Sequence, residues 1–294
     1  MKELTILSGK GGTGKTTVCA AFAALAANKV ISDCDVDAAD LHLLLDPTAQ
    51  HEENFIGGRT PQIDYRRCMK CGHCQTLCRF EAIDREEDGI CVIKELACEH
   101  CGLCALACPG QAIQMVDAVN GRWFISATRF GTLVHAQLGI GEDNSGKLVT
   151  RVRREARRIA EREGADLLIN DGPPGIGCPA TAAIAGTDVV LIITEPTLAG
   201  IHDLRRVIAL CRHFRLPALV CINKYDINEA QTALIQQECQ ADGVPVVGLI
   251  PFEPAVSRAL VARQTVVDFD CGPATDAVVA TWAHVQRTII GPAA

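Results

Sequence analysis

Residues 9–17 read Gly9-Lys10-Gly11-Gly12-Thr13-Gly14-Lys15-Thr16-Thr17 and follow a short apolar run at residues 4–7. The stretch satisfies the pattern G-x4-G-K-[ST], and an apolar helical pattern over residues 15–27 supplies the strand-to-helix context that this pattern requires. Its glycines let successive amide N–H groups face phosphate oxygens, while Lys15 neutralises the β- and γ-phosphates and the Thr16 hydroxyl holds Mg²⁺. The helix N-terminus adds its own positive end. The stretch therefore predicts a nucleotide-phosphate site between a strand and a helix.

The same alternation of strand and helix patterns continues along the chain. Further β-branched runs lie at residues 29–32, 166–170, 188–194, 218–222 and 245–250, and each of the later runs precedes a helical stretch. Such alternation predicts an α/β fold with a mainly parallel sheet and helices on both faces, as in a P-loop NTPase. Residues 122–126 are expected to rejoin the sheet after an interruption. Residues 139–147 resemble a polar loop, to which the sequence assigns no role.

The interruption contains two cysteine runs of identical spacing, C-x2-C-x2-C-x3-C, about thirty residues apart. In proteins with two [4Fe–4S] clusters this spacing gives three ligands to one cluster and the fourth to the other. One predicted ligand set is Cys68, Cys71, Cys74 and Cys108, and the other is Cys98, Cys101, Cys104 and Cys78. We therefore expect a small inserted α+β, ferredoxin-like domain at residues 57–117. The ATPase domain is expected to comprise residues 1–56 and 118–294.

Several alternatives remain for the cysteines. Eight of them can in principle bind two zinc ions, although zinc sites pair C-x2-C knuckles at longer separation. The first run ends Cys78-Arg79 where proline is usual, so that Arg79 either raises the potential of that cluster or is simply tolerated at the surface. The other cysteines mostly fall in apolar helices or strands, where free cysteine behaves as a small hydrophobe; they are residues 19, 34, 91, 178, 211, 221, 239 and 271.

The composition limits which classes of protein this chain can belong to. With 294 residues, 48% of them apolar, the chain can form one large α/β domain and a smaller one. Sixteen cysteines without an N-terminal signal-peptide pattern predict a cytoplasmic, reducing compartment in which thiols bind metal. No run reaches the roughly 18 to 20 apolar residues of a membrane span, so no membrane partner is expected. A net charge of −7 argues against a nucleic-acid partner, and the arginines at 151–162 are interpreted as a solvated helix face.

Lys10, inside the loop, makes it resemble the deviant P-loop of the MinD/ParA/Mrp family, to which the nitrogenase iron protein also belongs. Asp33-Cys34-Asp35 resembles the first switch of that family, and Leu167-Leu168-Ile169-Asn170-Asp171-Gly172-Pro173-Pro174-Gly175 resembles its Walker B strand and second switch. The resemblance implies that Asp35 orients or deprotonates the attacking water and that Asp171 holds Mg²⁺ through water. It also implies that the base is contacted by Asn223, Asp226, Pro251 and Phe252.

The resemblance further implies a nucleotide-sandwich homodimer, in which Lys10 of one subunit reaches the phosphates bound by the other. Competing interpretations are a Lys10 paired with an acid in its own subunit, and an Asp35 that serves only in the Mg²⁺ shell or as an N-cap, with Asp37 or Asp40 easily mistaken for it. Because Asn223-Lys224-Tyr225-Asp226 also resembles a guanine-reading motif, GTP remains an alternative to ATP. Cys178 lies near where relatives place ligands for a cluster shared across the dimer, but those relatives use two cysteines per subunit.

The resulting hypothesis is a Mg²⁺-dependent ATPase in which dimer closure gates electron transfer through two [4Fe–4S] clusters to a protein redox partner. The alternative is an iron–sulfur cluster assembly factor or regulatory ATPase resembling Mrp. In that case the clusters are cargo or structural elements, and the partner is an apo-protein.

Overall fold

The computed structural model describes residues 1–139, 142 and 146–290, which form two compact units. The large unit comprises residues 1–53, 123–138 and 146–290. The small unit comprises residues 54–122 together with residues 139 and 142, and the predicted insertion at 57–117 lies within it. Most of the predicted loop at 139–147 lies outside the described residues.

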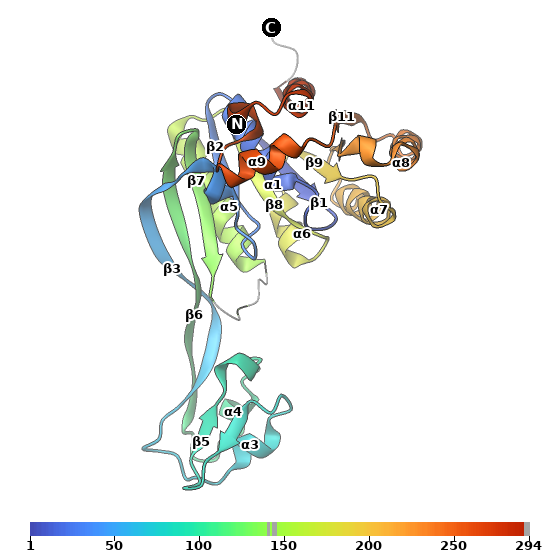
Figure 1. Ribbon diagram of the computed structural model, residues 1–294. Coiled ribbons are helices and arrows are strands. Elements are labelled where there is room, and N and C mark those ends of the chain that lie inside the picture. The colour runs from blue at the N-terminus through green and yellow to red at the C-terminus, as the bar shows by residue number, and fades with distance from the viewer. Residues whose placement is uncertain (140–141, 143–145, 291–294) are drawn as a thin grey trace. The chain divides into compact units, whose positions relative to one another are not determined.

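A nine-stranded sheet, counted over the described residues, has the order β11-β10-β9-β1-β8-β2-β7-β6-β3 (Figure 1). The strands from β11 to β7 pair in parallel throughout. Their bounds are β1 Lys2–Ser8, β2 Lys29–Asp33, β3 Thr48–Ile63, β6 Ile113–Thr128, β7 Gly131–Leu138, β8 Leu167–Pro174, β9 Val189–Thr194, β10 Ala218–Asn223 and β11 Val246–Ile250. The predicted strands all fall in this sheet, and the predicted mainly parallel α/β fold is confirmed.

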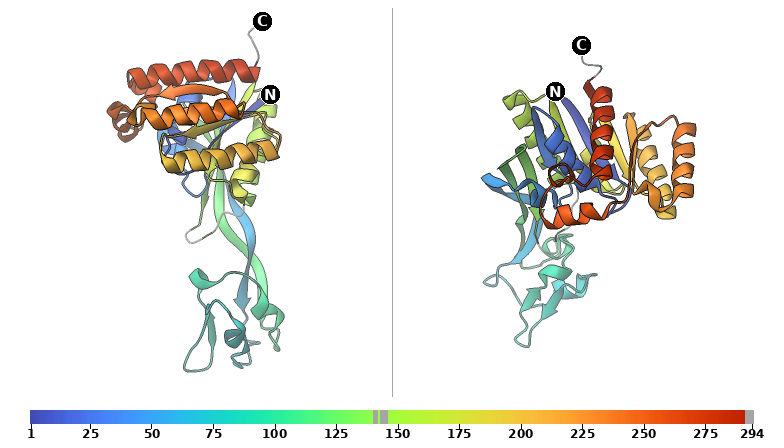
Figure 2. Two further views of the ribbon diagram at one scale, coloured as in Figure 1. Left: turned by 90° about the vertical axis from the view of Figure 1, so that its right-hand side faces the viewer. Right: turned by 45° about the horizontal axis from the view of Figure 1, so that its top comes forward.

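Helices alternate with these strands. In the large unit they are α1 Lys15–Leu25, α2 Leu41–Leu45, α5 Lys147–Glu163, α6 Cys178–Ile184, α7 Leu198–His213, α8 Glu229–Ala241, α9 Pro254–Val261, α10 Val266–Phe269 and α11 Pro273–Ile290, with a 3₁₀ turn at Tyr225–Ile227. The predicted arginine-rich helix is α5. Figures 1 and 2 show α1 and α11 on one face of the sheet and α6 and α7 on the other.

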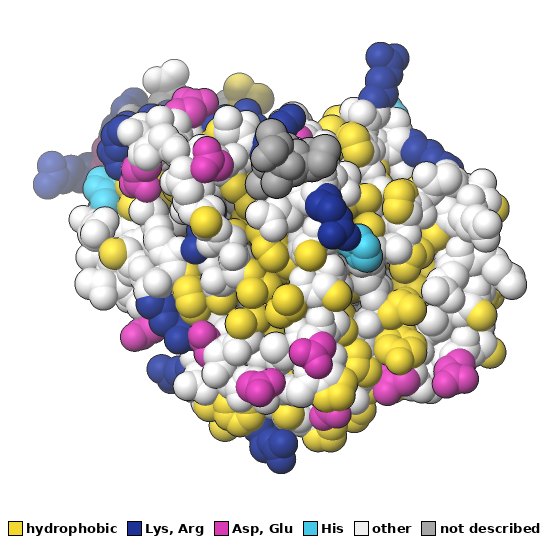
Figure 3. Space-filling view, turned by 90° about the horizontal axis from the view of Figure 1, so that it is seen from above, with side chains coloured by type: hydrophobic (Ala, Val, Ile, Leu, Met, Phe, Trp, Pro, Cys, Tyr) yellow, Lys and Arg dark blue, Asp and Glu magenta, His cyan; other side chains and the backbone are white. Residues whose placement is uncertain are grey.

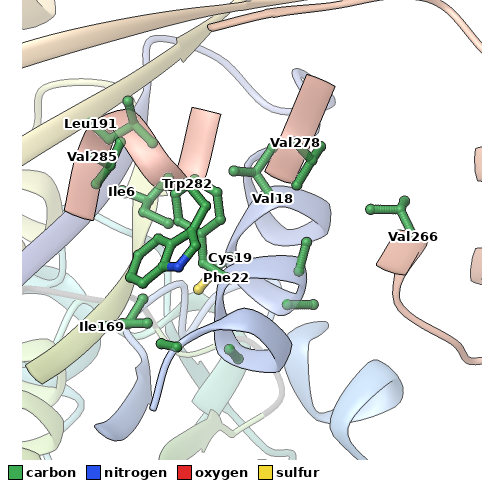
Figure 4. Close-up of a cluster of buried hydrophobic side chains, with 14 of the residues drawn as sticks. Ile6, Val18, Cys19, Phe22, Ile169, Leu191, Val266, Val278, Trp282 and Val285 are labelled. Carbon is green, nitrogen blue, oxygen red and sulfur yellow. The ribbon is translucent and has the colours of Figure 1, made fainter. Parts of the chain in front are cut away.

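Alternation of side chains along the central strands builds a core on each face. In β9, Val189, Leu191 and Ile193 join the cluster beneath α1 and α11, whereas Val190 and Ile192 join the cluster beneath α6, α7 and α8. This two-sided burial is typical of a parallel sheet. On the first face Phe22 of α1 packs against Trp282 of α11 with ring centroids 4.9 Å apart, and Figure 4 shows small and branched side chains around the indole. The face seen from above in Figure 3 has apolar side chains in its middle and charged ones around them.

Two long strands, β3 and β6, are mostly absent from the sequence prediction. β3 begins in the large unit and continues into the small one, and β6 returns from the small unit to the large one. The sequence predicted only residues 122–126 of them. Residues 48–54 of β3 are exposed and polar, and the apolar periodicity that reveals a buried strand is therefore missing there. The short helix α2 was also not predicted.

The small unit contains helices α3 His73–Leu77 and α4 Leu103–Leu106, the antiparallel strands β4 Ile83–Arg85 and β5 Cys91–Ile93, and a 3₁₀ turn at Glu95–Ala97. Its core is small: Ile63, Ile83, Cys91 and Ile113 are buried, with cysteines packed against them. The two sequence repeats pair crosswise, because the Asp64 amide donates to the Ala112 carbonyl at 2.7 Å and the Lys94 amide to the Ala82 carbonyl at 2.8 Å. Each repeat therefore forms backbone hydrogen bonds with the other, and the two fold as one unit.

Candidate functional site

A cavity of about 590 Å³ lies in the large unit at the carboxyl end of β1. Of the predicted nucleotide-site residues it is lined by Gly11, Gly12, Thr13, Gly14, Lys15, Thr16, Thr17, Asp35, Asn223, Pro251 and Phe252. Gly9 and Lys10 belong to the same loop but do not line the cavity, and neither do Asp171 and Asp226. Ligands of α/β sheets bind at this edge, where the strands end and helices begin.

The loop after β1 has the backbone of a phosphate cradle. Gly14, directly before α1, has a φ of 91°, which favours glycine. A Cβ at Gly14 would lie 2.4 Å from Nδ2 of Asn223, the nitrogen that donates a 2.8 Å hydrogen bond to the Thr13 carbonyl. Asn223, at the end of β10, therefore holds the loop in place, and its contact with a base stays a prediction.

Lys15 lies between two carboxylates that come from neighbouring strands. Its Nζ is 2.9 Å from Oδ1 of Asp171, in β8, and 3.2 Å from Oδ2 of Asp35, after β2. Burial by itself lowers the pKa of Lys15, but the two carboxylates outweigh it and raise that pKa above its usual value. Burial raises the pKa of Asp35, and the charge of Lys15 opposes the rise. The three groups form a charged cluster at the phosphate end of the cavity.

Asp33 belongs to the segment that resembles the first switch, but the sequence analysis gave it no role of its own. It is fully buried, and its two carboxylate oxygens accept hydrogen bonds from the amides of Asp35, at 3.1 Å, and Leu41, at 3.2 Å. Burial first, and then the charge of Asp171, raise the pKa of Asp33 well above its usual value. Asp33 thus ties the segment that carries Asp35 to the start of α2.

The donor groups fit a Mg²⁺ ion. Asp171 is fully buried, and among the described residues its Oδ2 has no hydrogen-bond partner, although such an atom is costly to bury alone. The Thr16 hydroxyl lies in the same region, within 3.4 Å of Lys15 Nζ. A carboxylate oxygen and a hydroxyl are ligands that Mg²⁺ prefers.

Lys10 is paired within its own chain. Its Nζ lies 2.5 Å from Oε1 of Glu195 and 3.4 Å from the hydroxyl of Thr197, both after β9. Lys224 contacts the other oxygen of Glu195 at 3.4 Å. Burial raises the pKa of Glu195, but the two lysines outweigh it and hold that pKa below its usual value. Glu195 belongs to no motif, and sequence reasoning therefore missed it.

The segment after β11 forms the part of the cavity where the sequence predicts the base. Pro251 and Phe252 line it, and Phe252 is half exposed. Asp226 accepts a 2.7 Å hydrogen bond from the Phe252 amide. In the described chain Asp226 therefore positions the Phe252 segment and is itself outside the cavity lining.

The eight cysteines of the two runs line two separate cavities in the small unit. The first cysteine cavity is lined by Cys68, Cys71, Cys74 and Cys108, and also by Cys91. The second cysteine cavity is lined by Cys78, Cys98, Cys101 and Cys104. Each cavity thus takes three cysteines from one run and the last cysteine of the other.

The two runs have matching local backbones. Lys70 and His100 have φ values of 55° and 51°, and each precedes the second cysteine of its run. The amides of Ala82 and Ala112 donate to the sulfurs of Cys78 at 3.4 Å and Cys108 at 3.3 Å. Backbone donors at cysteine sulfur stabilise thiolate ligands, as iron–sulfur clusters require.

The four run cysteines of each cavity are a donor set that fits a [4Fe–4S] cluster, which takes one thiolate at each iron. Over the described residues, no three Cys, His, Asp or Glu side chains converge closely enough to hold a single metal ion. Cys178 is exposed at the start of α6 in the large unit and is not among the residues that line the two cysteine cavities.

Comparison with known proteins supports the interpretation of the large-unit cavity as a nucleotide site. Residues 4–266 match the CobQ/CobB/MinD/ParA nucleotide binding domain. An uncharacterised protein of Methanocaldococcus jannaschii is 33% identical over 229 residues, covering 77% of this chain and 79% of that protein. A cytosolic Fe–S cluster assembly factor, the Nubp1 homolog of Drosophila grimshawi, is 29% identical over 144 residues, covering 42% and 46% of the two chains.

Solved structures share the fold. The septum site-determining protein MinD of Pyrococcus horikoshii, complexed with Mg-ADP, superposes with a TM-score of 0.58 at 17% identity, covering 98% of this chain and 96% of that one. The Cyanothece McdA–ATP complex has a TM-score of 0.58 at 16% identity, covering 97% and 96%.

The fold and the phosphate-binding loop define a P-loop nucleotide-binding protein. More particularly, the chain belongs to the CobQ/CobB/MinD/ParA family of nucleotide-binding domains, which includes the ATPases MinD and ParA. Along the described parts of the chain, none of the helices combines the length and the apolar character needed to cross a membrane.

Proposed function

We propose that this protein hydrolyses ATP with Mg²⁺ and that nucleotide-driven closure of a homodimer gates electron transfer through two [4Fe–4S] clusters to a protein partner. The observation that carries the proposal is the composition of the two cysteine cavities, which follows the crossed ligand pattern of two-cluster proteins in a chain that also has a P-loop cavity. GTP remains the alternative nucleotide.

In the proposed reaction Lys15 turns from the two carboxylates toward the β- and γ-phosphates, where it offsets developing negative charge. Asp35, thereby released from Lys15, accepts a hydrogen bond from the attacking water. Thr16 and Asp171 would hold Mg²⁺, which supplies charge neutralisation at the phosphates. Lys10 exchanges Glu195 for the phosphates bound by the partner subunit, so that dimer closure and hydrolysis depend on one another.

In the small unit the chain would hold the clusters, which supply one-electron transfer when bound. Cys68, Cys71, Cys74 and Cys108 form one ligand set, and the four cysteines of the second cysteine cavity form the other. The amides of Ala82 and Ala112 donate to ligand sulfurs and so stabilise negative charge there.

Helix α2 connects the nucleotide cavity to the strand that enters the small unit. Asp33 binds the Leu41 amide at the start of α2, and β3 begins at Thr48, directly after the helix ends at Leu45. Arg129 donates a 3.2 Å hydrogen bond to the Leu44 carbonyl, which holds α2 against the β6–β7 turn. A movement of the segment Asp33–Asp35 on nucleotide binding is therefore transmitted to the base of β3.

A second candidate is an iron–sulfur assembly factor or carrier, which the similarity to the Nubp1 homolog favours. The two candidates differ in the lability of the clusters. An electron carrier keeps them through repeated ATP turnover, whereas an assembly factor transfers one to an apo-protein.

Metal analysis after anaerobic purification tests the proposal. We expect about eight irons and eight sulfides per chain, because two cubane clusters contain that number. Cys98→Ala should lower both, while Cys178→Ala, at an exposed cysteine outside the cavities, should leave them unchanged. Stoichiometric zinc without sulfide would refute the cluster assignment. Loss of iron to an apo-ferredoxin during ATP turnover would favour the assembly factor.

A further inference from the structure

Cys91 is a ninth cysteine of the small unit and belongs to neither run. The sequence assigned it to the apolar interior as a small hydrophobe. It is indeed buried, at 1% exposure, in the core with Ile63, Ile83 and Ile113. It also lines the first cysteine cavity together with Cys74, which packs against the same small core. The shared cavity and the shared core place an additional thiol next to a predicted cluster ligand.

The position of Cys91 is fixed by the strand that carries it. Cys91 begins β5 and pairs with Arg85 of β4, and alternation along the strand turns its side chain into the core. Among the described residues, the second cysteine cavity is lined by its four run cysteines and by no further thiol. Thirty residues earlier in the repeat, the equivalent residue is Pro61, which is buried and lines the second cysteine cavity. At this position of the repeat, the first cysteine cavity therefore has a thiol donor where the second has a proline.

We propose that, in the cluster-loaded protein, the Cys91 thiol donates a hydrogen bond to the Cys74 sulfur and raises the reduction potential of the cluster in the first cysteine cavity. The inference rests on the proposed function, since it requires that cluster. A donor at a ligand sulfur stabilises negative charge, and the reduced cluster carries one more negative charge than the oxidised cluster. The hydrogen bond is therefore stronger after reduction, and the potential rises.

Other groups also act on the two cavities. Arg79 lines the second cysteine cavity and His73 the first. In the wild type, a difference between the midpoint potentials of the two clusters therefore includes the effects of Arg79 and His73 as well as that of Cys91. The informative comparison is between variants of a single position, with Arg79 and His73 kept.

The experiment is a potentiometric titration, followed by paramagnetic resonance, of anaerobically purified wild type, Cys91→Ala and Cys91→Ser. Cys91→Ala removes the donor, so that iron and sulfide should stay at the wild-type level while one midpoint potential falls and the other is unchanged. Cys91→Ser keeps a donor and should restore most of the lost potential. The reciprocal variant Pro61→Cys places a thiol in the second cysteine cavity and should raise the other midpoint potential.

Two results for the variants overturn the inference. If Cys91→Ala and Cys91→Ser both lose about half of the iron, Cys91 is a ligand instead of a donor. If iron is retained and both midpoint potentials of Cys91→Ala match the wild type, the thiol has no influence on the cluster. Failure of the proposed function is recognised separately, because the wild-type protein itself would then lack iron and sulfide.

Discussion

At the scale of single residues, the nucleotide cavity depends on two lysines with different partners. Lys15 is bound to Asp35 and to Asp171, which is a proposed Mg²⁺ ligand, and Lys10 is bound to Glu195. Both lysines must leave these carboxylates to reach phosphate. In the proposed function this exchange of partners links catalysis to a change of conformation.

Lys15→Ala and Lys10→Ala should each lower the ATP hydrolysis rate by about 10²-fold or more, since each removes a positive charge from the phosphoryl transition state. Asp35→Asn should still bind ATP but accumulate as a dimer. Phosphate release and size-exclusion chromatography measure the two effects. Lys2→Ala, at an exposed ion pair with Asp188, is the matched control. Wild-type hydrolysis by Lys10→Ala would contradict its proposed role across the dimer.

A second residue-scale prediction concerns His135 of β7. Its Nε2 lies 3.0 Å from the Ser126 hydroxyl, and its ring stacks on Phe124. Burial, and then the charge of His42, lower the pKa of His135 to about 4. In the unfolded chain the pKa returns to about 6.5. Because the unfolded state then binds the extra proton between these values, the free energy of unfolding should fall by about 2 kcal/mol from pH 7 to pH 5.

His135→Phe should lose that part of the pH dependence while keeping a ring in place. Urea denaturation followed by tryptophan fluorescence measures it, since Trp123 and Trp282 both lie in the large unit. His202→Ala, at an exposed histidine, serves as the control and should keep the wild-type slope. Equal pH slopes in the wild type and His135→Phe would show that His135 does not titrate in this way.

At the scale of elements, the approach of β8 to β1 positions Asp171. The register of this parallel pair shifts between Ile6 and Ser8, next to Gly172. A Cβ at Gly172 would lie 2.5 Å from Cδ2 of Leu7 and 2.9 Å from the Ile6 carbonyl oxygen. The backbone oxygen cannot move aside without disturbing the sheet, so that this glycine is required by close packing.

Gly172→Ala should therefore lower the free energy of unfolding by on the order of 1–3 kcal/mol and weaken ATP binding, because overpacking displaces Asp171. Denaturation curves and calorimetric titration with ATP measure both effects. Gly177→Ala, where the nearest atom to the new Cβ is Pro179 Cδ at 3.6 Å, should change stability by less than about 0.5 kcal/mol. If the two variants are equally stable, the close approach is not a constraint.

The elements that could be predicted are those with local signals. The phosphate loop has its glycines and Lys15, and the central strands have continuous apolar runs such as Val189–Thr194. The outer part of β3 has neither signal, because pairing with β6 forms it and its side chains remain exposed. Helix α2 is only five residues long and is fixed by Asp33 and Arg129 from distant parts of the chain.

The same distinction holds within the site. Spacing alone gave the division of the eight run cysteines, which are the same cysteines that line each cavity. Spacing could not find Glu195, the role of Asp33 or the cavity that Cys91 shares with Cys74, because each depends on which strands become neighbours. Residues that belong to a local motif can be predicted from the sequence. Partners that come together only when distant strands pair cannot.

At the scale of the whole molecule, the central claim is that nucleotide and clusters are coupled. The chain enters the small unit through β3, directly after α2, and leaves through β6. Closure of the segment Asp33–Asp35 around ATP should therefore alter the environment of at least one cluster. Linkage then requires the reverse effect, a change of nucleotide affinity with the oxidation state of the clusters by the same coupling free energy.

The most direct test is a potentiometric titration of the cluster-loaded protein with and without a non-hydrolysable ATP analogue and Mg²⁺, paired with nucleotide affinities in both oxidation states. The account predicts that the analogue shifts at least one midpoint potential, that the two sides of the cycle agree, and that Asp35→Asn with ATP keeps the shifted value. Identical potentials and identical affinities would contradict gating and leave the clusters as structural elements or cargo.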